Sequence, residues 1–204
     1  MLNIFYAIIA AYLIGSIPTS YLVGRVRGID VRKEGSGNVG ATNALRVIGK
    51  LPALIVLIAD IFKGVFAVTF LASFFYNTGI AVNYNLFRTL LGLSTIAGHN
   101  WSIFLKFKGG KGVATSCGVL MVLLPAAMAV AASVFFITVW RTKYVSLGSI
   151  LLSITVPIVA ALSGKDFVLV MLSVTICIII CYRHKSNITR LLTGTENRIS
   201  GNKS

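Results

Sequence analysis

Seven long runs of apolar residues occupy most of this sequence, and they restrict it to a fold built inside a membrane. Of the 204 residues, 56% are hydrophobic and 12% are charged, about half the charged share of a soluble domain. A membrane-spanning helix needs roughly 20 apolar residues, so the runs leave no room for a separate soluble domain. We therefore expect an all-α integral membrane protein that forms one domain over residues 1–204. The runs cover about 2–24, 51–76, 86–105, 112–124, 126–140, 144–163 and 166–182.

The basic residues predict how the chain crosses the membrane. There are 19 Lys and Arg against 5 Asp and Glu, and Lys and Arg accumulate in cytoplasmic loops. Residues 112–140 form either one long helix or two short helices hinged near Pro125. With two helices, 16 of the 19 basic residues fall on one side. We therefore predict about seven spans, some short or half-depth, with the N-terminus outside, the C-terminus inside, and three cytoplasmic segments: 25–50, 106–112 and the tail 183–204.

The net charge of +14 also bears on the partners. In a soluble protein, such a charge would suggest nucleic acid first, but the spans exclude nucleic acid. The remaining candidate partners are anionic lipids or anionic ligands at the membrane surface. Within the spans, Asp60 and Lys63 lie three residues apart on one helix face, and we expect them first to neutralise each other and second to support a functional site. Pro18 is expected to kink the first span, because it lacks a backbone N–H.

One cytoplasmic segment, here named the glycine loop (residues 108–112), has the composition of an anion site. Glycines leave backbone N–H groups uncovered, and the following helix directs the positive end of its dipole toward them. Lys108 and Lys111 add positive charge. The spacing is not that of a P-loop. The alternative is a flexible turn with ordinary cytoplasmic lysines. The glycines are Gly109, Gly110 and Gly112.

A second segment, loop 35–46, gathers small residues and uncharged hydrogen-bonding side chains. Arg46 at its end can bind a phosphate with both arms of its guanidinium group. The alternative is a helix cap, in which Thr42 or Asn43 starts a short helix that carries Arg46 toward lipid headgroups. The remaining candidates in this loop are Ser36, Asn38 and Gly40.

Two histidines are candidates for proton transfer, since histidine titrates near neutral pH. His184 lies in the tail with Asn187 and Glu196, where the alternative is a basic helix on the membrane surface. His99 precedes the glycine loop, where the alternative is a purely structural histidine. The three cysteines lie inside apolar runs and do not suggest disulfides or a metal site.

Taken together, these segments resemble the bacterial acyl-phosphate:glycerol-3-phosphate acyltransferases, an integral membrane family. The resemblance rests on three strings: Gly-Ser-Gly-Asn-Val-Gly-Ala-Thr-Asn at 35–43 followed by Arg46, Phe-Lys-Gly-Gly-Lys-Gly-Val-Ala-Thr at 107–115, and Arg-His at 183–184 continuing to Gly-Thr-Glu at 194–196. Further agreement comes from Gly15-Ser16-Ile17-Pro18, Asp60…Lys63-Gly64 and Gly98-His99. The match runs in order from about residue 12 to 198. Ser102 departs from the pattern where a proline is expected, and Ser186 where an acidic or polar residue is usual.

The resemblance implies transfer of a fatty acyl group from acyl phosphate to the sn-1 hydroxyl of glycerol 3-phosphate, giving lysophosphatidic acid and phosphate. It implies catalytic roles for Ser36, Arg46, Lys111, His184 and Asn187. It also implies a bacterial cytoplasmic membrane location, a site facing the cytoplasm, and a soluble partner enzyme that makes acyl phosphate. The implied substrate-binding residues are Asn38, Gly40, Thr42, Asn43, His99, Lys108, Gly109, Gly110, Gly112 and Glu196.

The chemistry agrees with this resemblance. Acyl phosphate is an activated anhydride, so direct transfer requires no enzyme nucleophile, and we expect no cofactor and no metal. Position and charge neutralisation would supply most of the rate. The base that assists the attacking hydroxyl is His184, His99 or a substrate phosphate oxygen. The His-x4-Asp dyad of acyl-CoA-dependent enzymes is absent from the sequence.

Two other functions use similar features. An organic-phosphate or anion transporter would bind its ligand with broken helices and glycine loops, but here the polar loops cluster on one side. A membrane scaffold would bind anionic lipids through its basic face. Movement of unaltered glycerol 3-phosphate across a sealed vesicle would identify the transporter.

Overall fold

The computed structural model describes residues 2–199, and the described residues form helices and no strands. The all-α prediction is therefore confirmed. The chain packs as two compact units, Met1–Leu123 and Leu124–Ser204. The single domain expected from the sequence stays a prediction.

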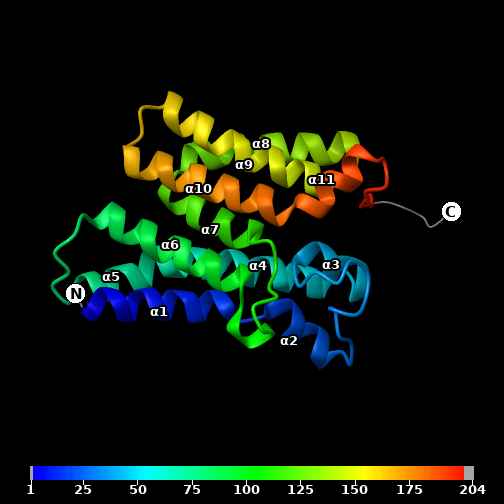
Figure 1. Ribbon diagram of the computed structural model, residues 1–204, viewed down its shortest axis with the longest axis horizontal. Helices are drawn as coiled ribbons and strands as arrows, with labels where there is room; N and C mark the ends of the chain where they lie inside the picture. The colour runs from blue at the N-terminus through cyan, green and yellow to red at the C-terminus, as the bar shows by residue number, and fades with distance from the viewer. Residues whose placement is uncertain (1, 200–204) are drawn as a thin grey trace. The chain divides into compact units, whose positions relative to one another are not determined.

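The first unit contains the helices drawn from blue to green in Figure 1. Helices α1 and α6 lie side by side, and α4 packs against α7. The elements are α1 Leu2–Ser16, α2 Thr19–Val26, α3 Ala41–Val47, α4 Lys50–Phe66, a π-helical turn Ala67–Leu71, α5 Ala72–Tyr76, α6 Tyr84–Asn100, a 3₁₀ turn Ile103–Leu105 and α7 Val113–Leu123.

The second unit is a helical hairpin extended by a third helix and a bent end. Helix α9 contacts both α8 and α10, and α11 turns away from α10 by 62° and also contacts α9. Figure 1 shows this unit from green to red. Its elements are α8 Pro125–Thr142, α9 Val145–Leu162, α10 Phe167–Arg183 and α11 Lys185–Leu192.

Each apolar run predicted from the sequence forms a helix, although the helices differ in length. Within residues 2–199, four stretches are long and apolar enough to cross a membrane: Leu2–Val26, Lys50–Tyr76, α8 and α9. The bent pair α10 and α11 makes a fifth. Helix α7 has 11 residues and rises about 16 Å, roughly half of a bilayer's hydrocarbon core. Seven spans and their orientation stay predictions.

The first span is broken at Pro18, as predicted. Helix α1 ends at Ser16 and α2 begins at Thr19. At the break, two backbone carbonyls accept hydrogen bonds from side chains of other segments. Ser102 Oγ donates to the Ser16 carbonyl at 2.5 Å, and Lys63 Nζ donates to the Ile17 carbonyl at 2.5 Å. The break in one helix is thus held by α4 and by the residues that follow α6.

The chain also breaks at Pro125, so residues 112–140 form two helices. Helix α7 ends at Leu123, Leu124 leaves the helical conformation with φ −137° and ψ 58°, and Pro125 occupies the first turn of α8. Proline suits this position because the first helical N–H has no intrahelical acceptor.

Glycines allow helices of the first unit to approach one another through their backbones. A Cβ atom on Gly64 or Gly118 would overlap the backbone of the facing helix where α4 crosses α7. The same holds for Gly15 and Gly98, where α1 crosses α6. Small residues at such crossings are the usual means of close packing in membranes.

We expect the substitution Gly118→Val to lower the free energy of unfolding by about 1–3 kcal/mol, because the added side chain must displace the backbone at Ile61. Thermal unfolding of the detergent-purified protein measures the effect. Ala129→Val on the exposed face of α8 is the control. Equal unfolding temperatures for the two variants would contradict the close crossing.

Candidate active site

Loop 35–46 ends in a helix that begins earlier than expected. Helix α3 begins at Ala41, and Gly40 precedes it in an extended conformation with no side-chain cap. The interpretation that Thr42 or Asn43 starts the helix is therefore wrong. Arg46 lies in the last turn of α3 and is exposed, as is Ser36. Asn38, Gly40 and Thr42 are partly buried.

The side chain of Asn43 holds loop 35–46 together. Its Oδ1 accepts hydrogen bonds from the Ser36 N–H at 2.8 Å and the Ser36 hydroxyl at 3.1 Å. Its Nδ2 donates to the carbonyls of Val31 at 2.9 Å and Glu34 at 3.2 Å. These four bonds use the full capacity of the amide, and the residue is only 1% exposed. The structure thus gives Asn43 a role in holding the loop, and its contact with substrate stays a prediction.

Loop 35–46 and the approach to the glycine loop lie at the same end of the first unit. Val39 and Ala44 share a buried cluster with Leu105, which belongs to the 3₁₀ turn after α6. Lys106 and Phe107 then adopt left-handed backbone conformations, with φ of 53° and 61°. Such conformations are costly for residues other than glycine and concentrate at functional sites. They turn the chain toward the glycine loop.

The glycine loop packs directly on the end of α6. The Gly110 N–H donates to the His99 carbonyl at 3.0 Å, and the Gly109 N–H donates to the Asn100 carbonyl at 3.2 Å. A Cβ on Gly109 would overlap the His99 carbonyl, and one on Gly110 would overlap the His99 ring. The expectation that these two N–H groups are uncovered is therefore wrong, because α6 carbonyls accept from them.

The expected anion site of this region therefore moves to the start of α7, where it stays a prediction. The first N–H groups of a helix have no intrahelical acceptor and carry its positive dipole end. Gly112 precedes α7 with φ +77°, a conformation that favours glycine. Lys108 is exposed and Lys111 is partly buried, so both contribute positive charge beside this helix end.

Asn100 is a residue that the sequence analysis missed. It is completely buried, and within residues 2–199 neither amide atom of its side chain has a hydrogen-bond partner. A Cβ on Gly112 would lie 2.6 Å from Asn100 Oδ1, so the amide lies against the start of α7. Its position directly after His99 and before the glycine loop was the available signal.

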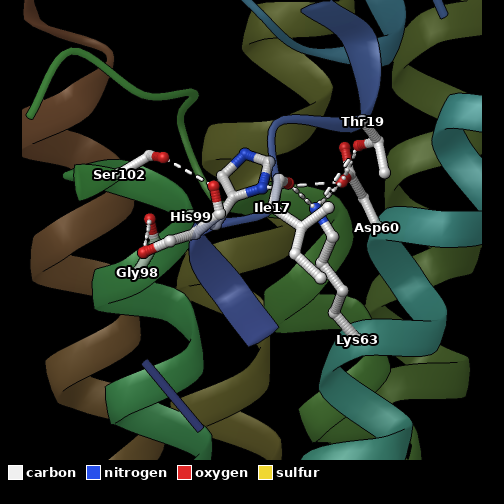
Figure 2. Close-up of polar contacts among 8 residues, drawn as sticks. Ile17, Thr19, Asp60, Lys63, Gly98, His99 and Ser102 are labelled. Carbon is white, nitrogen blue, oxygen red and sulfur yellow. Dashed lines mark hydrogen bonds and ion pairs between the residues drawn. The ribbon is translucent and has the colours of Figure 1, made fainter. Parts of the chain in front are cut away.

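A buried ionic cluster lies between the break in the first span, α4 and the end of α6 (Figure 2). Lys63 Nζ is 2.7 Å from Asp60 Oδ1, and the Thr19 hydroxyl donates to the same oxygen at 2.5 Å. His99 Nδ1 lies 3.7 Å from this oxygen. The side chains of Asp60 and Lys63 are 1% and 6% exposed. The predicted pairing is therefore confirmed, and it extends to α2 and α6.

A small cavity adjoins this cluster, with room for roughly one water molecule. It opens where the break in the first span meets the end of α6 and loop 35–46. It is too small for either predicted substrate. Its lining residues are Gly15, Ser16, Ile17, Pro18, Thr19, Val39, His99, Ser102 and Leu105.

In the second unit, Glu196 joins the tail to two helices. Its Oε1 accepts from Asn187 Nδ2 at 2.6 Å and from the Ser146 hydroxyl at 2.8 Å, and its Oε2 accepts from Arg190 Nε at 2.8 Å. Burial alone would raise the pKa of Glu196, but the hydrogen bonds from Asn187, Ser146 and Arg190 lower it below its ordinary value. Glu196 is therefore held as a carboxylate.

His184 is 3% exposed at the junction of α10 and α11, with Nδ1 2.8 Å from the Ile180 carbonyl. A carbonyl only accepts hydrogen bonds, so Nδ1 carries the proton of this contact. The structure thus groups His184, Asn187 and Glu196 in the second unit, whereas Ser36, Arg46, Lys111 and the other candidates lie in the first. That the two groups form one site stays a prediction.

Comparison with known proteins gives one consistent result. The family model described as glycerol-3-phosphate acyltransferase matches residues 5–194. A glycerol-3-phosphate acyltransferase of Desulforamulus reducens is 45% identical over 197 residues, which cover 96% of this chain and 95% of that protein. Two crystal structures of PlsY (YgiH), an integral membrane glycerol 3-phosphate acyltransferase, are also similar. The glycerol 3-phosphate form has a TM-score of 0.86 and the lysophosphatidic acid form 0.84. Each is 35% identical and covers 96% of this chain and 94% of its own.

We expect Asn43→Leu to speed amide hydrogen exchange across residues 31–36, because all four side-chain hydrogen bonds of Asn43 are lost. Exchange measured by mass spectrometry tests this. Ser36→Ala is the matched control, since its backbone N–H still donates to Asn43. Equal exchange in wild type and Asn43→Leu would contradict the holding role.

The lowered pKa of Glu196 predicts a pH-dependent contribution to stability. A carboxyl group whose pKa is lower in the folded state stabilises the fold fully when the pH is above its unfolded-state pKa, about 4.3. This stabilisation is lost as the pH falls through the folded-state pKa. The free energy of unfolding should therefore differ between wild type and Glu196→Gln at pH 7, and the difference should shrink below about pH 4. Glu34→Gln, at an exposed side chain, is the control. A difference that grows in acid would contradict the prediction.

Proposed function

The chain belongs to the glycerol-3-phosphate acyltransferase family, and from this premise we propose its reaction and the roles of its residues. The enzyme is an integral membrane acyltransferase whose acceptor is glycerol 3-phosphate and whose product is lysophosphatidic acid. The acyl donor is acyl phosphate, and inorganic phosphate is released. The observation that carries the proposal is the placement of loop 35–46 and the glycine loop at one end of the first unit.

Electrostatics explains why this site is basic. Both substrates are phosphates, and two unit charges 4 Å apart repel by about 1 kcal/mol in water and several-fold more near a protein surface. Arg46, Lys108 and Lys111 offset this repulsion. The start of α7 adds uncharged N–H donors directed at the same region. Charge neutralisation therefore lets the two phosphates approach within reacting distance.

The contacts of Ser36 support direct transfer without an acyl-enzyme. Its hydroxyl donates to Asn43 Oδ1 at 3.1 Å, and an amide oxygen does not take up the proton as a general base would. Ser36 instead acts as a fixed polar group beside the donor phosphate. The sn-1 hydroxyl of glycerol 3-phosphate attacks the acyl carbon, the carbon–oxygen bond to phosphate breaks, and phosphate leaves with the electron pair.

The proton of the attacking hydroxyl passes to His184, His99 or a substrate phosphate oxygen. With a proton on Nδ1, a neutral His184 ring would accept at Nε2. Asn187 and Glu196 position this segment through their mutual hydrogen bond. We propose catalytic roles for His184 and Asn187.

The site faces the cytoplasm of a bacterial cell, at the inner leaflet of the cytoplasmic membrane. The distribution of Lys and Arg supports this orientation. A soluble enzyme that forms acyl phosphate delivers the donor to the basic face. The fatty chain of the donor lies in the bilayer beside the helices.

We expect the detergent-purified protein to acylate glycerol 3-phosphate with acyl phosphate, and not with acyl-CoA or acyl carrier protein. Arg46→Gln should lower kcat/KM by about 10²–10³-fold, because it removes a donor to the reacting phosphate. Lys165→Gln, the same change of charge in the exposed turn before α10, should leave kcat/KM unchanged. Radiolabelled product measured by extraction into organic solvent checks both.

The same preparation in sealed vesicles distinguishes an enzyme from a carrier. Movement of labelled glycerol 3-phosphate into the vesicles without chemical change would identify a transporter. Acyl transfer from acyl-CoA at a comparable rate would contradict the proposed donor.

A further inference from the structure

We propose that Asp60 and Lys63 are positioning residues that set the geometry of the glycine loop through His99. The inference rests on the proposed function, in which the region around the glycine loop binds glycerol 3-phosphate. Both residues lie outside the three long strings, in the shorter Asp60…Lys63-Gly64 agreement with the family. Both lie in the middle of a membrane-spanning stretch, Lys50–Tyr76, where charged residues are costly.

Mutual neutralisation alone does not account for the contacts of this pair. A simple pair requires one contact, yet Lys63 Nζ also donates to the Ile17 carbonyl at 2.5 Å and contacts the Thr19 hydroxyl at 3.3 Å. Asp60 Oδ1 accepts from Thr19 as well as from Lys63 and faces His99. The pair therefore ties α4 to both sides of the break in the first span and to the end of α6.

His99 continues the connection from the ion pair to the glycine loop. Its Nδ1 faces Asp60, and a Cβ added to Gly110 would overlap its Nε2. Its own carbonyl accepts from the Gly110 N–H at 3.0 Å. The imidazole ring thus lies between Asp60 and Gly110. Figure 2 shows the side of the ring that faces Asp60. A shift of this ring displaces the glycine loop.

The consequence for catalysis concerns one substrate. Interactions that hold the phosphate of glycerol 3-phosphate equally in the ground state and the transition state affect KM and leave kcat nearly unchanged. Displacing the glycine loop should therefore weaken glycerol 3-phosphate binding selectively. The KM for acyl phosphate serves as an internal reference within each variant.

The first test replaces the ion pair by apolar residues, Asp60→Leu with Lys63→Met, since buried pairs can often be replaced in this way without loss of stability. We expect KM for glycerol 3-phosphate to rise about tenfold, with kcat and the KM for acyl phosphate changed by less than about threefold. Ser94→Ala, which removes a partly buried α6 hydrogen bond to the Ile8 carbonyl, is the control and should alter neither KM. Wild-type KM values in a folded double variant would overturn the proposal.

A milder pair of variants keeps the test decisive if the double variant does not fold. Thr19→Val removes the hydroxyl that donates to Asp60 at nearly constant volume, and should raise KM for glycerol 3-phosphate about threefold or more. Thr19→Ser retains the hydroxyl and should restore the wild-type value. Equal KM values for the two variants would overturn the proposal.

Equilibrium binding of labelled glycerol 3-phosphate separates this inference from the proposed function. A wild-type protein that binds glycerol 3-phosphate without acylating it contradicts the proposed function alone. Weaker binding by Thr19→Val than by Thr19→Ser supports the positioning role whatever the reaction. Equal binding by the two variants contradicts the positioning role.

Discussion

The ammonium group of Lys63 is the contact on which the arrangement of the first unit depends. It lies deep in an apolar helix and is stable there because Asp60 neutralises it and the Ile17 carbonyl accepts from it. That carbonyl is available only because Pro18 interrupts the first span. A charge that is costly in a bilayer thus finds an acceptor at the helix break, where the Ile17 carbonyl also accepts from the Thr19 N–H at 3.0 Å. Their contact fixes where α2, α4 and α6 meet.

The sequence was sufficient for features that depend on local chemistry. Apolar runs predicted the helices, and Pro18 and Pro125 marked the two breaks. It was insufficient where the outcome depends on contacts between distant segments. The N–H groups of Gly109 and Gly110 bond to carbonyls about ten residues earlier, at Asn100 and His99, and no composition rule signals that pairing. The number of spans and the orientation rest on charge bias alone.

The polar residues of the three strings divide by exposure into two kinds. Ser36, Arg46 and Lys108 are exposed. Asn43 and Glu196 are buried and use their hydrogen-bonding capacity on the protein itself. Ser102, which departs from the proline expected by resemblance, belongs to the second kind, because its hydroxyl bonds to the Ser16 carbonyl. A proline has no hydroxyl with which to make that bond.

The return of the glycine loop onto α6 has a consequence for how the chain can vary in length. Two successive N–H groups pair with two successive carbonyls in reverse order, so the segment between Asn100 and Gly109 closes a ring of fixed size. Inserting or deleting one residue there would offset both pairs and bring a side chain against His99. Natural length variation should therefore accumulate elsewhere, for example in the turn 77–83.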